Sequence, residues 1–193
     1  MFIDEKILIR LMRVAYKGSG VYIGRFDGWY VISSSYWTAS MAVGCVSNKV
    51  LAAIVELSGQ LPEDGEAWTA DKGKNQLEGY DHRTVEEPRS DGSGMSIAPM
   101  YLRSPGGTAL AVLQNDTDGR ILTVPINLVN ASIGIADRQN GEENVVGPVY
   151  DGNRGAYWYT NHAEWHVIST RYEELDDIVK HCEQISLEYA VRD

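Results

Sequence analysis

The amino-acid sequence predicts an α+β fold in which helices cover an antiparallel sheet. Amphipathic helix patterns lie near both ends of the chain, and β-prone runs separated by turn residues fill most of the space between them. The regular alternation of strands and helices that builds a parallel sheet is absent. With 193 residues the chain is long enough to bury a core, and we predict a single domain over residues 1–193.

The first predicted element is an N-terminal amphipathic helix between Asp4 and Gly18. Asp4 is a suitable N-cap residue, and a glycine commonly follows the last turn of a helix. Basic residues recur at helical spacing along it: Lys6, Arg10, Arg13 and Lys17. The apolar run 7–9 also suits a buried strand, so the sequence leaves that alternative open.

A β-hairpin is predicted after this helix. The runs Val21–Phe26 and Trp29–Ser33 are β-prone, and Asp27-Gly28 stands between them. Asp-Gly favours a two-residue hairpin turn, since both turn positions need positive φ. The two residues that flank the turn would then form a cross-strand aromatic pair.

A second helix is predicted between Ser47, as its N-cap, and Gly59, with Pro62 beyond its end. Its apolar residues cover a wide face, so we expect this helix to be buried. From residue 63 the sequence turns polar, and it ends in a cluster of Pro, Ser, Asp and Gly residues. We predict an exposed or flexible excursion over residues 63–95.

The next part of the chain holds three strand-like runs joined by turn residues. They cover Ser96–Arg103, Thr108–Gln114 and Ile121–Leu128. We predict that they form an antiparallel meander. The segment 141–155 is rich in Gly and Asn and is predicted as a loop.

A strand over Ala163–Ser169 and a C-terminal amphipathic helix complete the prediction. Thr170 and Glu173 have the spacing of a capping box, which places the start of this helix. Apolar residues then recur at intervals of three, four and seven, and this spacing puts Cys182 on the buried face.

The chain is acidic, with a formal net charge of −10 and a pI near 4.8. A protein held to nucleic acid by phosphate contacts needs a basic face, so we do not expect direct nucleic-acid binding. The charge is uneven, because residues 1–62 carry six cations and four anions and the rest of the chain is acidic. An acidic surface suits a basic protein partner or the imitation of nucleic-acid charge.

Two cysteines are too few for a disulfide framework, and charged residues at 4–6 interrupt any signal peptide. No run approaches the roughly 18 apolar residues that a membrane span needs. We therefore predict a cytoplasmic protein with no membrane partner.

The aromatic composition is biased toward side chains with a polar group, with 11 Tyr and 5 Trp against 2 Phe. Most fall into two patches of the sequence, and such side chains suit grooves and interfaces. We predict that the two patches line one shared surface. The predicted ligand-binding residues are Tyr22, Trp29, Tyr30, Trp37, Tyr157, Trp158, Tyr159 and Trp165. The competing interpretation is that these side chains only cover a small sheet.

Cys45 and His166 are the candidate catalytic residues. Cys45 precedes the predicted helix at Ser47, where a helix dipole favours the thiolate, and His166 lies on a later predicted strand. This chain order resembles that of nucleophile and base in papain-like cysteine hydrolases, which makes a hydrolase or acyl transferase one hypothesis. No local signature surrounds the cysteine and no third orienting residue stands out, so an inert, buried Cys45 is the alternative.

No metal site or cofactor is predicted. His162 and His166 lie four residues apart, but the run around them suits a strand better than the helix that would let both bind one ion. The run 116–119 resembles the start of a calcium loop without its later acidic ligand, and we predict a tight turn there.

The C-terminal helix carries a strongly negative face. The predicted partner-binding residues on it are Glu173, Glu174, Asp176 and Asp177. They could meet a basic partner or imitate a phosphate backbone, and the alternative is an ordinary solvated face.

The sequence favours a binding protein over an enzyme. We expect a non-catalytic cytoplasmic protein of the inhibitor, immunity or accessory type, which engages a protein or small ligand through its Tyr and Trp patches and acidic surface. The alternatives are the cysteine-dependent enzyme with Cys45 and His166 and a protein that imitates nucleic-acid charge.

Overall fold

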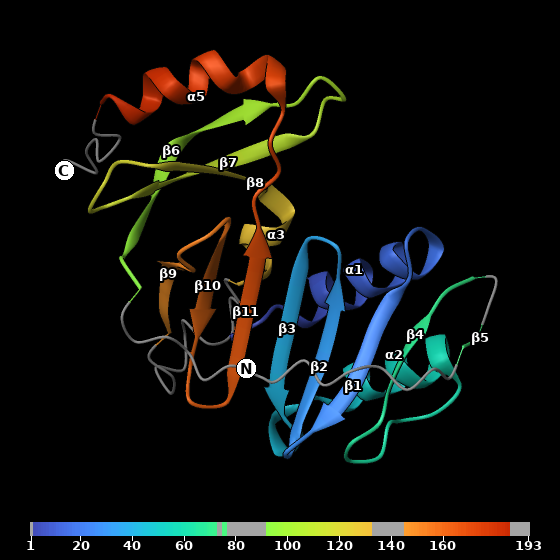
Figure 1. Ribbon diagram of the computed structural model, residues 1–193. Coiled ribbons are helices and arrows are strands. Elements are labelled where there is room, and N and C mark those ends of the chain that lie inside the picture. Colours follow the sequence, from blue (N-terminus) through green and yellow to red (C-terminus); the bar gives the residue numbers. More distant parts are fainter. Residues whose placement is uncertain (1, 73–74, 77–91, 133–144, 186–193) are drawn as a thin grey trace.

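Two antiparallel sheets and their covering helices make up the structure, a computed structural model that describes residues 2–72, 75–76, 92–132 and 145–185 (Figure 1). The predicted α+β class is confirmed. The helices are α1 (Glu5–Lys17), α2 (Asn48–Ser58), α3 (Ile126–Ala131) and α5 (Asp176–Glu183), with short 3₁₀ turns η1 (Val43–Cys45) and η2 (Glu173–Leu175).

Among the described residues the larger sheet has the strand order β5-β4-β1-β2-β3-β11-β10-β9. Its strands are β1 (Val21–Phe26), β2 (Trp29–Ser34), β3 (Trp37–Ala42), β4 (Ala67–Ala70), β5 (Asn75–Gln76), β9 (Val146–Tyr150), β10 (Gly155–Tyr159) and β11 (Ala163–Ile168). The smaller sheet has the order β6-β7-β8, from β6 (Met95–Arg103), β7 (Ala109–Asn115) and β8 (Ile121–Pro125). The predicted meander over these three strands is confirmed.

The first half of the chain follows the local signals of its sequence. The Asp4 carboxylate accepts a hydrogen bond from the Ile7 N–H at 2.9 Å, so residues 7–9 belong to α1 and not to a strand. Asp27 and Gly28 both adopt positive φ, at 49° and 79°, and close the predicted hairpin.

The second helix also begins and ends where the sequence predicts. The Ser47 Oγ accepts a hydrogen bond from the Val50 N–H at 3.3 Å, and Gly59 follows the helix in the left-handed conformation with φ of 87°. The helix is buried along one side only, since Val55 is 42% exposed.

Part of the predicted excursion over 63–95 is a strand of the larger sheet. Ala67–Ala70 pairs with β1, and Trp68 on it is only 4% exposed. Trp68 and Ala70, which is 1% exposed, therefore face the core, although their surroundings in the sequence are polar. Residues 73–74 and 77–91 of the predicted excursion lie outside the described residues.

Two predictions in the second half need correction. The strand predicted over Ile121–Leu128 ends at Pro125, which lacks an N–H to continue the ladder, and α3 follows it. The loop predicted over 141–155 contains β9 in its described part. Glycine is needed within β9 because a Cβ on Gly147 would lie 2.6 Å from the Tyr157 carbonyl oxygen.

The predicted capping box of the last helix does not form. The Thr170 N–H donates instead to the Thr123 carbonyl oxygen of β8 at 2.9 Å, and the helical turns begin only at Glu173. Thr170 thus joins the chain after β11 to the smaller sheet. Cys182 is buried as predicted, on the side of α5 that packs against the smaller sheet.

Helices α1 and α2 lie on one face of the larger sheet, and α5 covers the outer face of the smaller sheet (Figure 1). The short α3 lies between the two sheets, where the Ala131 carbonyl accepts a hydrogen bond from the Asp4 N–H at 2.8 Å. The inner face of the smaller sheet joins the main core through Leu113 and Val124. In the described parts of the chain, no helix is both long and apolar enough to cross a membrane.

Candidate functional site

The predicted aromatic patches are divided between the two faces of the larger sheet, because successive side chains of a strand point to opposite faces. Four of the eight predicted ligand-binding residues face the helices and are at most 4% exposed: Tyr30, Trp37, Trp158 and Trp165. The Trp37 and Trp165 rings stack with centroids 5.5 Å apart. For these four residues the prediction of ligand binding is corrected, since they form the core.

The other four predicted aromatic residues lie on the second face of the sheet: Tyr22, Trp29, Tyr157 and Tyr159. The strand register continues from one patch to the other there. Tyr22 stands opposite Ser33, Ser33 opposite Thr38, Thr38 opposite His166, and His166 opposite Tyr157. A row of polar side chains therefore crosses five strands on this face. Ser33 and Tyr157 within the row are only 2% and 5% exposed, and a shared ligand-binding surface stays a prediction.

His166 has a charged partner on this face that the sequence analysis missed. Its Nε2 lies 3.0 Å from the Asp151 Oδ2, and both side chains are about a quarter exposed or less, at 27% and 21%. The chain turns sharply after Asp151, whose Oδ1 accepts a hydrogen bond from the Asn153 N–H at 2.7 Å. The Asp-Gly-Asn run at 151–153 is the one sequence signal for this turn.

The pKa of Asp151 lies below its ordinary value. Burial opposes ionisation of the carboxyl, but the hydrogen bonds from His166 and from the backbone at Gly155 and Asn153 outweigh that effect. The stabilisation from these contacts is fully present above the unfolded pKa of about 3.9 and is lost as the pH falls through the lower folded value.

We therefore expect the stability difference between wild type and Asp151→Asn to shrink as the solution is acidified. Urea unfolding near pH 7 and at about pH 3 measures this difference. His166→Gln should show the same trend, because it removes a hydrogen bond that lowers the pKa of Asp151. A difference that is equal at both pH values would contradict the prediction.

Cys45 and His166 do not come together. His166 stands opposite Thr38, whereas Cys45 lies in η1 beyond Ala42, the last residue of β3. Ala42 lies four residues beyond Thr38 along the strand, or about 13 Å. Cys45 is exposed and not in the core, so its inert, buried alternative is also incorrect.

The remaining sequence motif is the run 116–119, which resembles the start of a calcium loop. The run 116–119 is a tight turn in which Asn115 Oδ1 accepts hydrogen bonds from the N–H groups of Thr117 and Asp118, as predicted. Among the described residues no cluster of His, Cys, Asp and Glu side chains could hold a metal ion.

The predicted acidic face of the last helix is divided. Glu173, Glu174 and Asp177 are exposed, whereas Asp176 accepts two hydrogen bonds from the Arg171 guanidinium at 3.0 and 2.6 Å. This contact lowers the pKa of Asp176 and raises that of Arg171.

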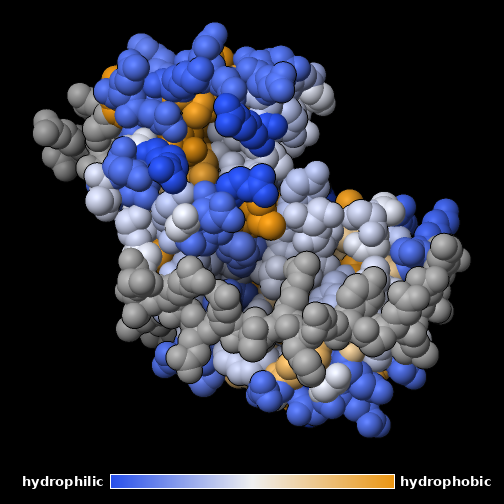
Figure 2. All heavy atoms as spheres, viewed as in Figure 1, coloured by the Kyte–Doolittle hydropathy of each residue, from blue (hydrophilic) through white to orange (hydrophobic). Residues whose placement is uncertain are grey.

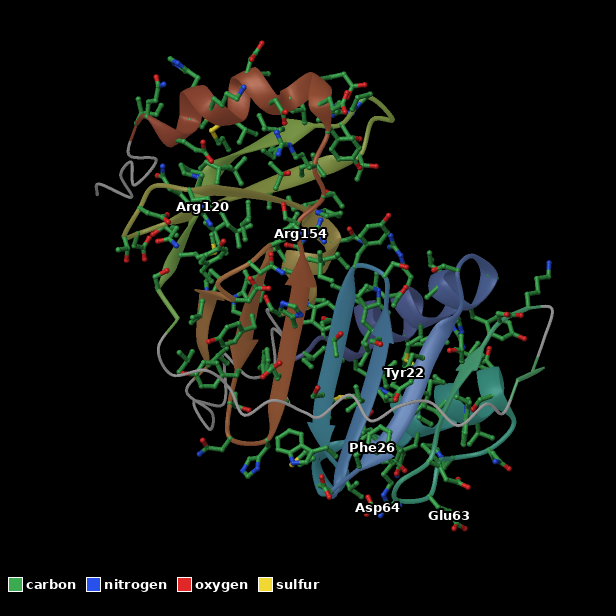
Figure 3. The ribbon with its side chains drawn as sticks, viewed as in Figure 1. Tyr22, Phe26, Glu63, Asp64, Arg120 and Arg154 are labelled. Carbon is green, nitrogen blue, oxygen red and sulfur yellow. The ribbon has the colours of Figure 1, made fainter. Side chains whose placement is uncertain are left out.

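Arg171 belongs to a cleft of about 440 Å³ between α5, β8 and the β9–β10 turn, here called the α5 cleft. Four cations line it: Arg120, Arg154, Arg171 and Lys180. Figure 3 shows Arg120 and Arg154 where the smaller sheet meets the upper ends of β10 and β11. Figure 2 shows hydrophilic side chains on both sides of a narrow apolar strip in the same region, below α5.

The Arg120 side chain is held by a tyrosine. Its guanidinium carbon lies 5.5 Å from the centroid of the Tyr150 ring, and its Nη1 donates to the Tyr150 hydroxyl at 2.6 Å. That hydroxyl donates in turn to the Asn153 carbonyl at 2.7 Å. The same turn that orients Asp151 toward His166 therefore also holds the tyrosine that orients Arg120.

The floor of the α5 cleft is apolar. Ile121 and Leu175 are 7% and 9% exposed, and Val179 of α5 packs beside them. Asp176 and Glu183 supply negative charge at one side of the cleft. A ligand that combines an apolar body with an anionic group would match both parts of this lining.

Comparison with known proteins does not assign the site. No protein-family model, no curated protein and no solved structure matches this chain. The assignment of function therefore depends on the geometry of the site itself.

Proposed function

We propose that the protein is a non-catalytic binding protein that holds a small anionic ligand in the α5 cleft. The observation that carries this proposal is the gathering of four cations around one apolar cleft in a chain with a net charge of −10. Such a cluster repels itself unless an anion offsets it, and nearby carboxylates offset only part of it.

The dimensions and chemistry of the cleft support a compact ligand with phosphate or carboxylate groups. Its volume of about 440 Å³ falls within the usual range for small-molecule sites. Guanidinium groups present several N–H donors in a plane, which suits the paired oxygens of phosphates and carboxylates.

Arg154 is the cation best placed to bind the ligand. Arg171 already pairs with Asp176, and Arg120 is held by Tyr150. Within the described ranges the Arg154 side chain has no hydrogen bond or ion pair, whereas its carbonyl is fixed by the Ser169 N–H at 2.7 Å. The backbone is thus anchored while the guanidinium remains available to an anion.

Binding without catalysis agrees with the arrangement of reactive side chains. Cys45 and His166 are separated along β3, so the cysteine-dependent mechanism lacks its nucleophile and base pair. The Asp151–His166 pair belongs to the second face of the larger sheet and not to the lining of the α5 cleft.

The test is a thermal-shift screen followed by calorimetric titration, with pyrophosphate, citrate and adenosine diphosphate as probes. We expect at least one probe to bind and to raise the melting temperature, as any ligand specific for the folded state must do. Arg154→Gln should weaken its affinity about tenfold, which corresponds to about 1.4 kcal/mol for a lost charge-assisted contact.

Arg103→Gln is the matched control, because it makes the same charge change on exposed β6 outside the cleft. Its affinity should stay within about twofold of wild type, since a distant surface charge is screened by salt. Equal weakening by both variants, or no binding by any probe at millimolar concentration, would overturn the proposal.

A further inference from the structure

A second hollow gathers cations on the outer side of the two N-terminal helices. It is a groove of about 730 Å³ between α1 and α2, here called the α1–α2 groove. The cations that line it are Lys6, Arg10, Arg13 and Lys17 of α1, and Lys49 of α2. Together the two hollows hold nine of the 17 cations in the chain, so positive charge is concentrated where the surface is concave.

Two ion pairs join the two helices beside the groove. Lys49 contacts Glu5 at 2.9 Å near the start of both helices, and Arg13 contacts Glu56 at 2.6 Å further along both. The contacts follow the same order along both helices, so α1 and α2 run parallel.

The remaining cations have no such partner. Over the residues that the structure describes, Lys6, Arg10 and Lys17 form no ion pair, and all three are exposed. With Arg13 they stand one per turn along about 16 Å of helix axis. The groove therefore presents a regular row of positive charge.

Between the cations the lining is apolar and partly composed of small side chains. On the α2 side the small side chains of Ala52 and Ala53 leave the space that forms the groove. On the α1 side Ile9 and Val14 line it. Val14 is 61% exposed, an unusual position for a large apolar residue on a helix whose other apolar side chains are largely buried. The lining thus offers apolar contact as well as charge.

We propose that the α1–α2 groove binds an acidic, amphipathic helix of a partner protein. A helix with carboxylates at positions i, i+4, i+7 and i+11 would place one carboxylate near each cation of α1. Its apolar side chains on the same side would enter the hollow over Ala52 and Ala53. This surface is separate from the α5 cleft and does not depend on the function proposed there.

Two other polyanionic partners fit less well. Membrane-surface helices insert Trp, Phe or Leu side chains, and the exposed large apolar residues of the described α1 and α2 are only Val14 and Val55. The phosphates of a nucleic acid would be repelled by a protein of net charge −10. The charged nucleic-acid backbone would also gain nothing from the apolar lining of the groove.

The test is fluorescence anisotropy with a labelled, helix-forming peptide of about 16 residues that has glutamate at the spacing above and leucine between. A peptide of the same composition in scrambled order is its control. We expect the ordered peptide to bind and the scrambled one to bind about tenfold more weakly, because charge and apolar contact must lie on one side.

Arg10→Glu/Lys17→Glu is the decisive variant, since it leaves both ion pairs of the helices intact. It should weaken peptide binding about tenfold or more, and lysine at the two facing peptide positions should restore it. Arg103→Glu lies outside the groove on exposed β6 and is the matched control for Arg10→Glu alone, which carries the same charge change. It should bind as wild type does, whereas Arg10→Glu alone should weaken binding. Circular dichroism verifies that each variant is folded.

Three outcomes would overturn this proposal. One is equal weakening by Arg10→Glu and its control Arg103→Glu. Another is failure of the lysine peptide to restore binding to a folded groove variant. The third is stronger binding to anionic vesicles or to an oligonucleotide duplex than to the ordered peptide, with the same loss in the groove variant.

Discussion

Replacing Trp165 by alanine is expected to lower the free energy of unfolding by about 4 kcal/mol, the range for removal of a large aromatic side chain from a core. Trp165 is fully buried, stacks on Trp37, and donates its Nε1–H to the Leu128 carbonyl of α3 at 2.8 Å. The substitution removes all three contributions at the point where α3 packs on the larger sheet. Urea unfolding followed by circular dichroism measures the loss.

Trp165→Phe separates the hydrogen bond from the volume of the side chain. Phenylalanine keeps most of the stacking but leaves the Leu128 carbonyl without its donor, so we expect a loss of about 1–3 kcal/mol. Because Trp165 is buried away from both proposed binding sites, its own fluorescence should not change when either proposed ligand binds. A loss below about 1.5 kcal/mol for Trp165→Ala would contradict the central position assigned to it.

The second large effect is expected at Gly155, where β10 begins. A Cβ there would meet the Asp151 Oδ2 and the His166 Nε2, each at 2.4 Å, and the Val167 carbonyl oxygen at 2.7 Å. Gly155→Ala must therefore displace the Asp151–His166 pair and also strain the pairing of β10 with β11. We expect a loss of about 3 kcal/mol in the free energy of unfolding.

Gly44→Ala is the control for this substitution, because a Cβ on Gly44 meets nothing within 4 Å and its φ is not positive. It should change the free energy of unfolding by less than about 0.5 kcal/mol. Chemical-shift changes of the His166 ring in Gly155→Ala would locate the disturbance. If Gly155→Ala is as stable as Gly44→Ala, the close approach of Asp151 and His166 at this turn is wrong.

The sequence predicted best the elements whose signals are local. The cap at Asp4 and the Asp27-Gly28 turn are set by neighbouring residues, and both were confirmed. The predicted start of the last helix was wrong because the Thr170 N–H donates to the Thr123 carbonyl of β8. This tertiary contact outweighs the capping-box pattern.

The candidate sites depend on contacts that no spacing in the sequence reveals. The four cations of the α5 cleft come from separate parts of the chain. Arg120 lies between β7 and β8, Arg154 between β9 and β10, Arg171 between β11 and η2, and Lys180 on α5. The aromatic residues of both patches lie on strands of one sheet, but strand alternation sends half of the predicted ligand-binding side chains into the core. Only the row of cations on α1 was visible in advance, through its helical spacing.

The bonds between Thr123 and the segment after β11 have a consequence for how the α5 cleft opens. The Thr123 N–H donates to the Ser169 Oγ at 3.2 Å, and its carbonyl accepts from both the Ser169 hydroxyl and the Thr170 N–H at 3.0 and 2.9 Å. These hydrogen bonds connect β8 of the smaller sheet to the segment that follows β11 of the larger sheet, and they resist rotation of one sheet against the other. We therefore expect the cleft to admit its ligand by rotation of long arginine side chains, with little hinge motion of the backbone.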